Sequence, residues 1–95
     1  MRIKLKDRDY SIHFKHEPRV TTALIDEHLF PYYRLAEGRA FCSPQDNFSK
    51  VKGRKIALAR ALQIWLPNTQ PGYRDNRREV WRQLVEGGMR IVPRK

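Results

Sequence analysis

The chain has 95 residues, of which 40% are hydrophobic; this is enough for one domain with a compact core and leaves little room for a second. No apolar run approaches the roughly 18 residues of a membrane span, and the alternating N-terminus lacks the apolar block of a signal peptide. Cys42 is the one cysteine, so no intrachain disulfide can form, and we expect a cytoplasmic protein in a reducing setting.

Charge is distributed unevenly along the chain. Residues 1–49 hold eight Lys or Arg and seven Asp or Glu, whereas residues 50–95 hold twelve and three. The net charge of +10 therefore belongs almost wholly to the second half. A field of one sign over half of a small domain attracts phosphate backbones, although a basic surface also serves solubility alone. We expect the second half to contact a polyanion.

The first sixteen residues alternate between polar and apolar side chains, which is typical of half-buried strands. The apolar members are Ile3, Leu5, Tyr10, Ile12 and Phe14. Because Asp suits tight backbone geometry, the segment 6–9 predicts a turn. We therefore expect a β-hairpin over about 2–15, with pairing interrupted at Pro18.

The middle of the chain is less distinctive. Residues 20–22 favour a strand, but residues 23–29 could instead form a short helical turn before Pro31. Further on, strands are expected at Tyr32–Ala36 and Arg39–Cys42, joined by a tight turn at Glu37–Gly38.

Two helices are predicted in the second half, over 43–66 and 75–87. Ser43-Pro44 is a helix-start pattern, with Asp46 and Ser49 as alternative caps, and Asp75 could cap the second helix. Gly87-Gly88 supplies a left-handed stop. The expected apolar faces consist of Val51, Leu58, Leu62 and Trp65 in the first helix and of Val80, Trp81, Leu84 and Val85 in the second.

These elements predict an α+β fold, in which a small antiparallel sheet packs against two C-terminal helices. The sheet would contain the N-terminal hairpin and one or two further strands. Residues 89–92 could add a last strand before a basic tail at 93–95.

Nine basic residues form the candidate binding surface. They are Lys50, Lys52, Arg54, Lys55 and Arg60 of the first helix, with Arg74, Arg77, Arg78 and Arg82 of the second. Arg74, Arg78 and Arg82 recur every four residues and so line one ridge. Forked Arg donors match phosphate oxygens, although pairing with Glu79 or Glu86 is the simpler structural interpretation.

Two residues depart from a simple amphipathic helix. Arg54 falls within the apolar arc, where it must extend to solvent, pair with Asp46 or contact a ligand. Gly53 lowers helix stability by about 0.5–1 kcal/mol relative to Ala, so we expect close approach of another backbone, from the protein's own hairpin or from a bound strand.

Catalysis, metal binding and cofactor binding are not expected. His13 and His16 would point to opposite faces of a strand, and the chain has no CxxC or HExxH motif. Nuclease chemistry at Asp26, Glu27 and His28 is a distant alternative, and Cys42 is expected to be a buried small residue rather than a reactive thiolate. Three tyrosines could stack on unpaired bases, while both tryptophans belong to the core; these are Tyr32, Tyr33, Tyr73, Trp65 and Trp81.

The segment Cys42–Leu62 carries the pattern C-x-P-x-D-x-F-x-K-x-x-G-R-x-I-A-x-x-R-A. This pattern resembles a segment of small, mostly uncharacterised proteins of bacteriophages and prophages. The resemblance implies a mobile-element accessory protein that binds nucleic acid or blocks host defence machinery, as an anti-CRISPR-like inhibitor does.

The sequence therefore predicts a non-enzymatic binding protein. Its partner is expected to be nucleic acid or a host complex that handles nucleic acid, and the alternative is an inhibitor that binds a host effector protein directly. If about six phosphates are neutralised, the logarithm of affinity should fall against the logarithm of salt with a slope near −5.

Overall fold

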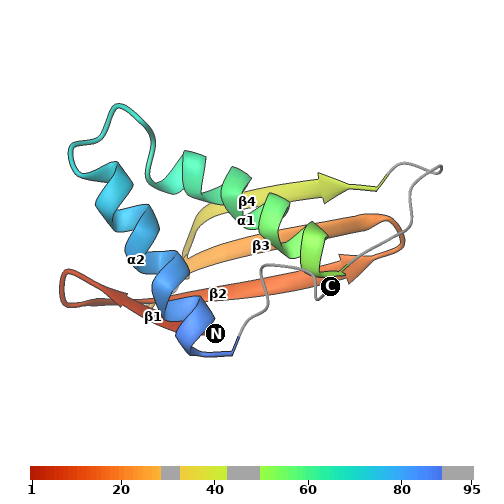
Figure 1. Cartoon of the computed structure of the whole chain (residues 1–95), viewed down its shortest axis with the longest axis horizontal. Helices are drawn as coiled ribbons and strands as arrows, with labels where there is room; N and C mark the ends of the chain where they lie inside the picture. Colours follow the sequence, from red (N-terminus) through yellow and green to blue (C-terminus); the bar gives the residue numbers. More distant parts are fainter. Residues whose placement is uncertain (29–32, 43–49, 89–95) are drawn as a thin grey trace.

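The computed structural model describes residues 1–28, 33–42 and 50–88. Four strands and two helices follow one another: β1 (Arg2–Leu5), β2 (Arg8–Glu17), β3 (Val20–Glu27), β4 (Tyr33–Phe41), α1 (Lys50–Trp65) and α2 (Tyr73–Glu86). The strands form one antiparallel sheet in the order β1-β2-β3-β4, and both helices lie on the same face of it (Figure 1). The predicted α+β fold, with its N-terminal hairpin and two C-terminal helices, is confirmed.

The first hairpin closes through a two-residue turn. Leu5 pairs with Arg8, and both residues between them have positive φ, 48° at Lys6 and 65° at Asp7. Positive φ at both central positions defines the turn type whose twist suits a hairpin, and Asp tolerates this conformation well.

The second hairpin closes at Pro18. Glu17 pairs with Val20, so pairing is interrupted at Pro18, as predicted, and Pro18 and Arg19 form a two-residue turn. Proline sets its own φ for the first central position, and Arg19 takes a φ of 62° at the second, as in a type II turn. Residues 23–27 continue β3 as a central strand, so the helical alternative for that segment is wrong.

The fourth strand corrects a second prediction. β4 continues without a turn at Glu37–Gly38, where Gly38 pairs with Ala23. Gly38 is required by packing instead. A β carbon there would lie under 3.0 Å from two backbone atoms of α1, the carbonyl oxygen of Ala57 and the amide nitrogen of Ala61. The helix therefore rests directly on the strand.

Small residues bring α1 close to the sheet. Ala23 of β3 and Ala36 and Ala40 of β4 are buried on the face that α1 covers. Gly53 of α1 lies over Thr21, whose Oγ1 would be 2.5 Å from an added β carbon. The close approach predicted at Gly53 is thus an internal contact, made with a side chain of β3.

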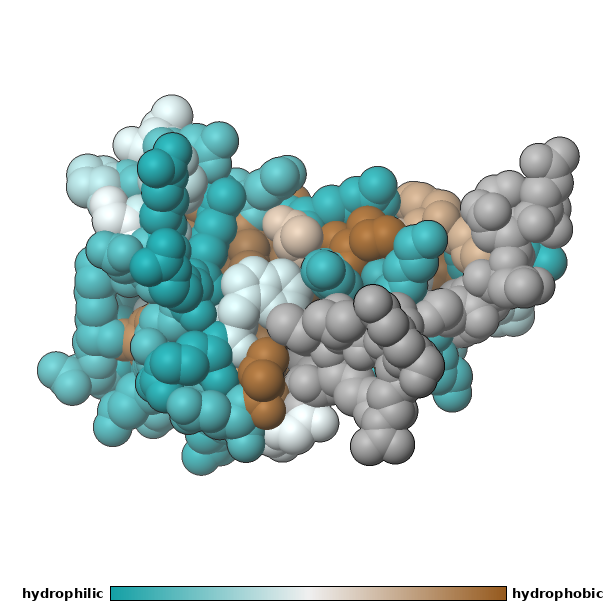
Figure 2. All heavy atoms as spheres, in the orientation of Figure 1, coloured by the Kyte–Doolittle hydropathy of each residue, from teal (hydrophilic) through white to brown (hydrophobic). Residues whose placement is uncertain are grey.

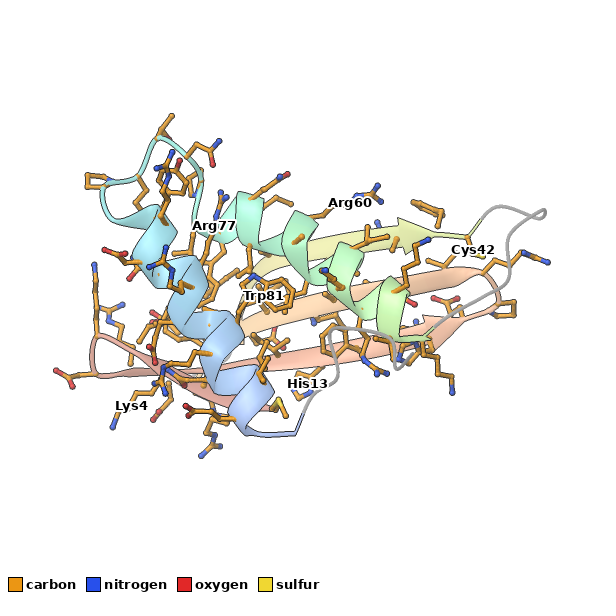
Figure 3. All side chains as sticks on the ribbon, viewed as in Figure 1. Lys4, His13, Cys42, Arg60, Arg77 and Trp81 are labelled. Carbon is orange, nitrogen blue, oxygen red and sulfur yellow. The ribbon has the colours of Figure 1, made fainter. Side chains whose placement is uncertain are left out.

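The predicted apolar faces of the helices are largely confirmed. Leu58, Leu62, Val80 and Leu84 are fully buried, whereas Val85 is 46% exposed. Both tryptophans pack partly buried against the core, and Trp65 stacks on Tyr10 with ring centroids 4.7 Å apart. Figure 3 shows Trp81 between α2 and α1.

The ends of α2 differ in part from prediction. The helix begins at Tyr73 after Gly72, which has a φ of 76° and no side chain with which to cap it; Asp75 lies within the first turn. At the other end, Gly88 has a φ of 97°, in agreement with the predicted left-handed stop. The expected start of the first helix before Lys50 and the expected strand at 89–92 lie outside the described residues.

Helix side chains cover parts of both edges of the sheet. Gln83 of α2 accepts a hydrogen bond from the amide of Lys4 (2.8 Å) and donates one to its carbonyl (2.6 Å), which satisfies the outer edge of β1 at that residue. On the opposite edge, Arg60 of α1 donates to the carbonyl of Arg39 (2.5 Å). Such contacts remove the free backbone groups to which another strand could pair.

Neither described helix is long and apolar enough to cross a membrane. Figure 2 shows mainly hydrophilic residues over α2 and smaller hydrophobic areas near α1.

Candidate nucleic-acid interface

The first turns of α1 present a dense group of cations. Lys50, Lys52 and Lys55 are exposed, and Arg54 is half-buried, as its place in the apolar arc implies. Lys50, Arg54 and Lys55 form no ion pair with a carboxylate among the described residues. Asp46, the partner predicted for Arg54, lies outside those residues.

The β2–β3 turn brings further basic residues to the same end of the molecule. His16 pairs in the sheet with Thr21, the residue on which Gly53 of α1 rests. Burial lowers the pKa of His16, and the charges of Arg54 and Lys50 lower it further. The helix start and the turn are therefore electrostatic neighbours.

We name this region the basic end. It comprises Lys15, His16 and Arg19 of the hairpin with Lys50, Lys52, Arg54 and Lys55 of α1. The hairpin residues were missing from the predicted site. The signal that could have found them is the Pro18-Arg19 pair between two β patterns, which marks a tight turn and places Lys15 and His16 near its tip.

Arg60 serves a different purpose. Its guanidinium holds the carbonyl of Arg39, so it attaches α1 to β4. In Figure 3 it lies on the β4 side of α1.

Arg77 and Arg74 organise the start of α2. The Nε of Arg77 donates to the carbonyl of Leu66 (2.9 Å) and its NH2 donates to Oδ1 of Asn68 (2.9 Å). The same guanidinium lies 4.8 Å from the ring centroid of Tyr73, and Arg74 donates to the Tyr73 hydroxyl (3.1 Å). These contacts fix the α1–α2 connection and cover the ring that was predicted to stack on bases.

Arg82 is neutralised within its own helix. It pairs with Glu79 and with Glu86, the latter at 2.7 Å. Hydrogen bonds from Arg82 and then Gln83 lower the pKa of Glu79 to about 2. Arg78 of the predicted ridge is exposed and has no ion pair among the described residues. The ridge at Arg74, Arg78 and Arg82 thus has one member held by two carboxylates.

The two helices do not combine their cations into one surface. The first residues of α1 lie beside the β2–β3 turn, whereas α2 begins beyond the other end of α1 (Figure 1). A helix of 16 residues is about 24 Å long, so this length separates the two groups. Lys50, Lys52, Arg54 and Lys55 lie within the first two turns of α1, and the four cations of α2 lie apart from them.

Of the residues considered for nuclease chemistry, Asp26 and His28 line one cavity of about 540 Å³ with Ser11 and His13, whereas Glu27 is not among its lining residues. Asp26 pairs with Arg34, while Glu27 is 3% exposed and pairs with Arg8 at 3.1 Å. Adjacent strand residues point to opposite faces of a sheet, which keeps these two carboxylates apart. Among the described residues no three His, Cys, Asp or Glu side chains gather closely enough to hold a metal ion.

His28 lies between a serine and an arginine. Its Nε2 contacts the hydroxyl of Ser11, and its Nδ1 lies 3.2 Å from NH2 of Arg2. Because a guanidinium only donates, Nδ1 must accept, which leaves Nε2–H to donate to Ser11. A histidine that activates a serine needs a free lone pair at Nε2, so this arrangement is the reverse of a nucleophile and its base. Cys42 is half-buried at the end of β4, and Arg19 donates to its sulfur (3.9 Å).

No protein-family model matches the chain, and the comparisons with curated proteins and with solved structures give no match either.

Proposed function

We propose that the protein is a non-enzymatic nucleic-acid-binding protein that engages the phosphate backbone with its basic end. The observation that carries this proposal is that Lys50, Arg54 and Lys55, all on the first turns of α1, have no carboxylate partner among the described residues. Unpaired cations release the counterions of a phosphate backbone at no cost of broken ion pairs.

The structure favours the basic end over α2 as the contact. Phosphate binding at Arg82 would replace its contacts with Glu79 and Glu86, and binding at Arg77 would replace its bonds to the α1–α2 connection. Lys55 and Lys50 have no such contacts to lose. The number of phosphates contacted should thus be nearer four than six, with a salt slope of about −3.5.

A salt titration tests this proposal directly. Fluorescence anisotropy with single-stranded and duplex probes should give a linear fall of log affinity with log salt. The double variant Lys50→Gln/Lys55→Gln should reduce the slope by about 2. Arg82→Gln is the matched control, because it removes one charge that is already neutralised, and its slope should remain close to that of the unaltered protein. A slope near zero, or equal loss in control and double variant, would refute the proposal.

A second candidate is a mobile-element inhibitor that binds a host effector protein, as the resemblance of Cys42–Leu62 to phage accessory proteins favours. This candidate predicts weak affinity for purified DNA and RNA but retention of one specific partner in a nuclease-treated bacterial lysate. Loss of all retained protein after nuclease treatment would exclude it and support direct nucleic-acid binding.

A further inference from the structure

A cavity of about 730 Å³ opens between β2, the first turns of α1 and the residues that follow α2. Its size is that of a small-ligand site. The pairing of β1 with β2 ends near Ser11 and Ile12, so within the described chain β2 has no neighbouring strand on that side from His13 onward.

One part of the cavity is basic. Arg54 and His16 line it, and none of the described residues that line the cavity is acidic. Lys50 lies close enough to lower the pKa of His16 together with Arg54, after the larger effect of burial. Like charges are thus crowded at one point, and an anion placed between them would relieve their repulsion.

The other part of the cavity is apolar. Ile12 is buried, whereas Phe14 and Val51 are partly exposed and line the same space. Phe14 and His16 stand two residues apart in β2 and so share one face of the strand. An aromatic ring beside a cationic group can receive a base and its phosphate together.

We propose that this cavity binds a phosphate monoester at the end of a nucleic-acid strand, with Arg54 and His16 contacting the phosphate and Phe14 contacting the terminal base. The proposal rests on the proposed function and names the part of the strand that the basic end holds. Arg54 presents a forked pair of donors, which matches two oxygens of one phosphate. A contact with the phosphate inside the cavity explains why Arg54 is half-buried.

Binding of a phosphate should be linked to protonation of His16. The groups that face this imidazole are Arg54 and Lys50 from α1 and the Thr21 hydroxyl from β3, whose Oγ1 lies 3.3 Å from Nδ1. On its own strand, Lys15 and Glu17 flank it. A phosphate dianion opposes the two cations of α1, so the pKa of His16 should rise when it binds.

The first test uses inorganic phosphate and the histidine resonances in NMR spectra. Phosphate should raise the pKa of His16 in the unaltered protein and leave it unchanged in Arg54→Gln. Arg54→Lys, which keeps the charge but loses the fork, should show an intermediate response if Arg54→Gln unfolds. An unchanged His16 in the unaltered protein at saturating phosphate would overturn the proposal.

The second test compares one short oligonucleotide with a 5′-phosphate and with a 5′-hydroxyl at the same salt concentration. The phosphorylated form should bind about tenfold more tightly, as expected for charge-assisted hydrogen bonds, and Arg54→Gln should abolish this difference while Arg82→Gln preserves it. Equal affinity of the two forms refutes the cavity proposal and leaves the proposed function standing. If neither form binds at low salt, the proposed function fails and the strand-end proposal fails with it; a shift of His16 by inorganic phosphate would then assign the cavity to a free phosphate ligand.

Discussion

Replacing Gly38 by alanine tests the closest contact in the fold. Gly38 lies within β4 and does not have the positive φ that would demand glycine. From this backbone conformation alone, Gly38→Ala should stabilise the protein by about 0.4–1 kcal/mol, because alanine restricts the unfolded chain. The structure predicts instead that Gly38→Ala destabilises the protein.

The size of the effect follows from the geometry. The new β carbon would lie under 3.0 Å from the Ala57 carbonyl oxygen and the Ala61 amide nitrogen, whereas ordinary contact begins at 3.4 Å. Both obstacles are backbone atoms, so no rotamer change relieves them, and α1 must move away from the sheet by more than 0.4 Å. We expect destabilisation of about 3 kcal/mol, at the upper end of overpacking effects, and a fall in Tm of about 12–24 °C.

Thermal and urea unfolding followed by circular dichroism measure this effect. Gly87→Ala is the matched control, because there the nearest atom is the terminal carbon of the flexible Met1 side chain at 3.0 Å and φ is −77°. The control should change stability by less than about 1 kcal/mol. An unchanged or raised Tm in Gly38→Ala would refute the packing of α1 on β4 described above.

Two further predictions separate structural from binding cations and fix the role of the α2 ion pairs. Arg77→Ala should lower the free energy of unfolding by about 1–3 kcal/mol, because the Leu66 carbonyl loses a charged donor. Its affinity for nucleic acid should change no more than that of Arg82→Gln. Calorimetry and fluorescence anisotropy on the same samples measure the two quantities, and a larger loss of affinity would mean that Arg77 binds phosphate. Glu79 has a lowered pKa, so its contribution to stability is present at neutral pH and is lost as the pH falls from about 4.5 to about 2. The difference in Tm between the unaltered protein and Glu79→Gln should therefore disappear near pH 2. A difference in Tm that does not depend on pH would contradict the ion pair.

The elements that sequence reasoning predicted correctly share strong local signals. The alternation around Ile3 and Ile12 identifies the first hairpin, and the helical spacing of Leu58, Leu62 and Leu84 identifies two buried helix faces. These patterns depend only on the spacing of residues that are near one another in the chain. They can therefore be recognised without knowledge of the tertiary structure.

The errors occurred where a residue serves a distant contact. Gly38 was interpreted as a turn residue because glycine is common in turns, but its actual role is to admit the backbone of α1, which follows it by about twenty residues. This distinction is not visible in local propensity, because it depends on what lies opposite in space. The turn at Pro18 and Arg19, by contrast, has a local signal in the sequence.

The candidate site could also be predicted only in part. A count of basic residues does not reveal which of them already form ion pairs with carboxylates. Lys55 and Arg82 contribute equally to the net charge, yet Arg82 must exchange two carboxylates for a phosphate, whereas Lys55 exchanges only water. The favourable part of phosphate binding at Arg82 is therefore a difference between two similar interactions and is small. By this reasoning the place to search for a polyanion is where cations lack partners and stand near one another. In the described chain that place is the start of α1 beside His16, where Lys50 and Arg54 already act on one imidazole.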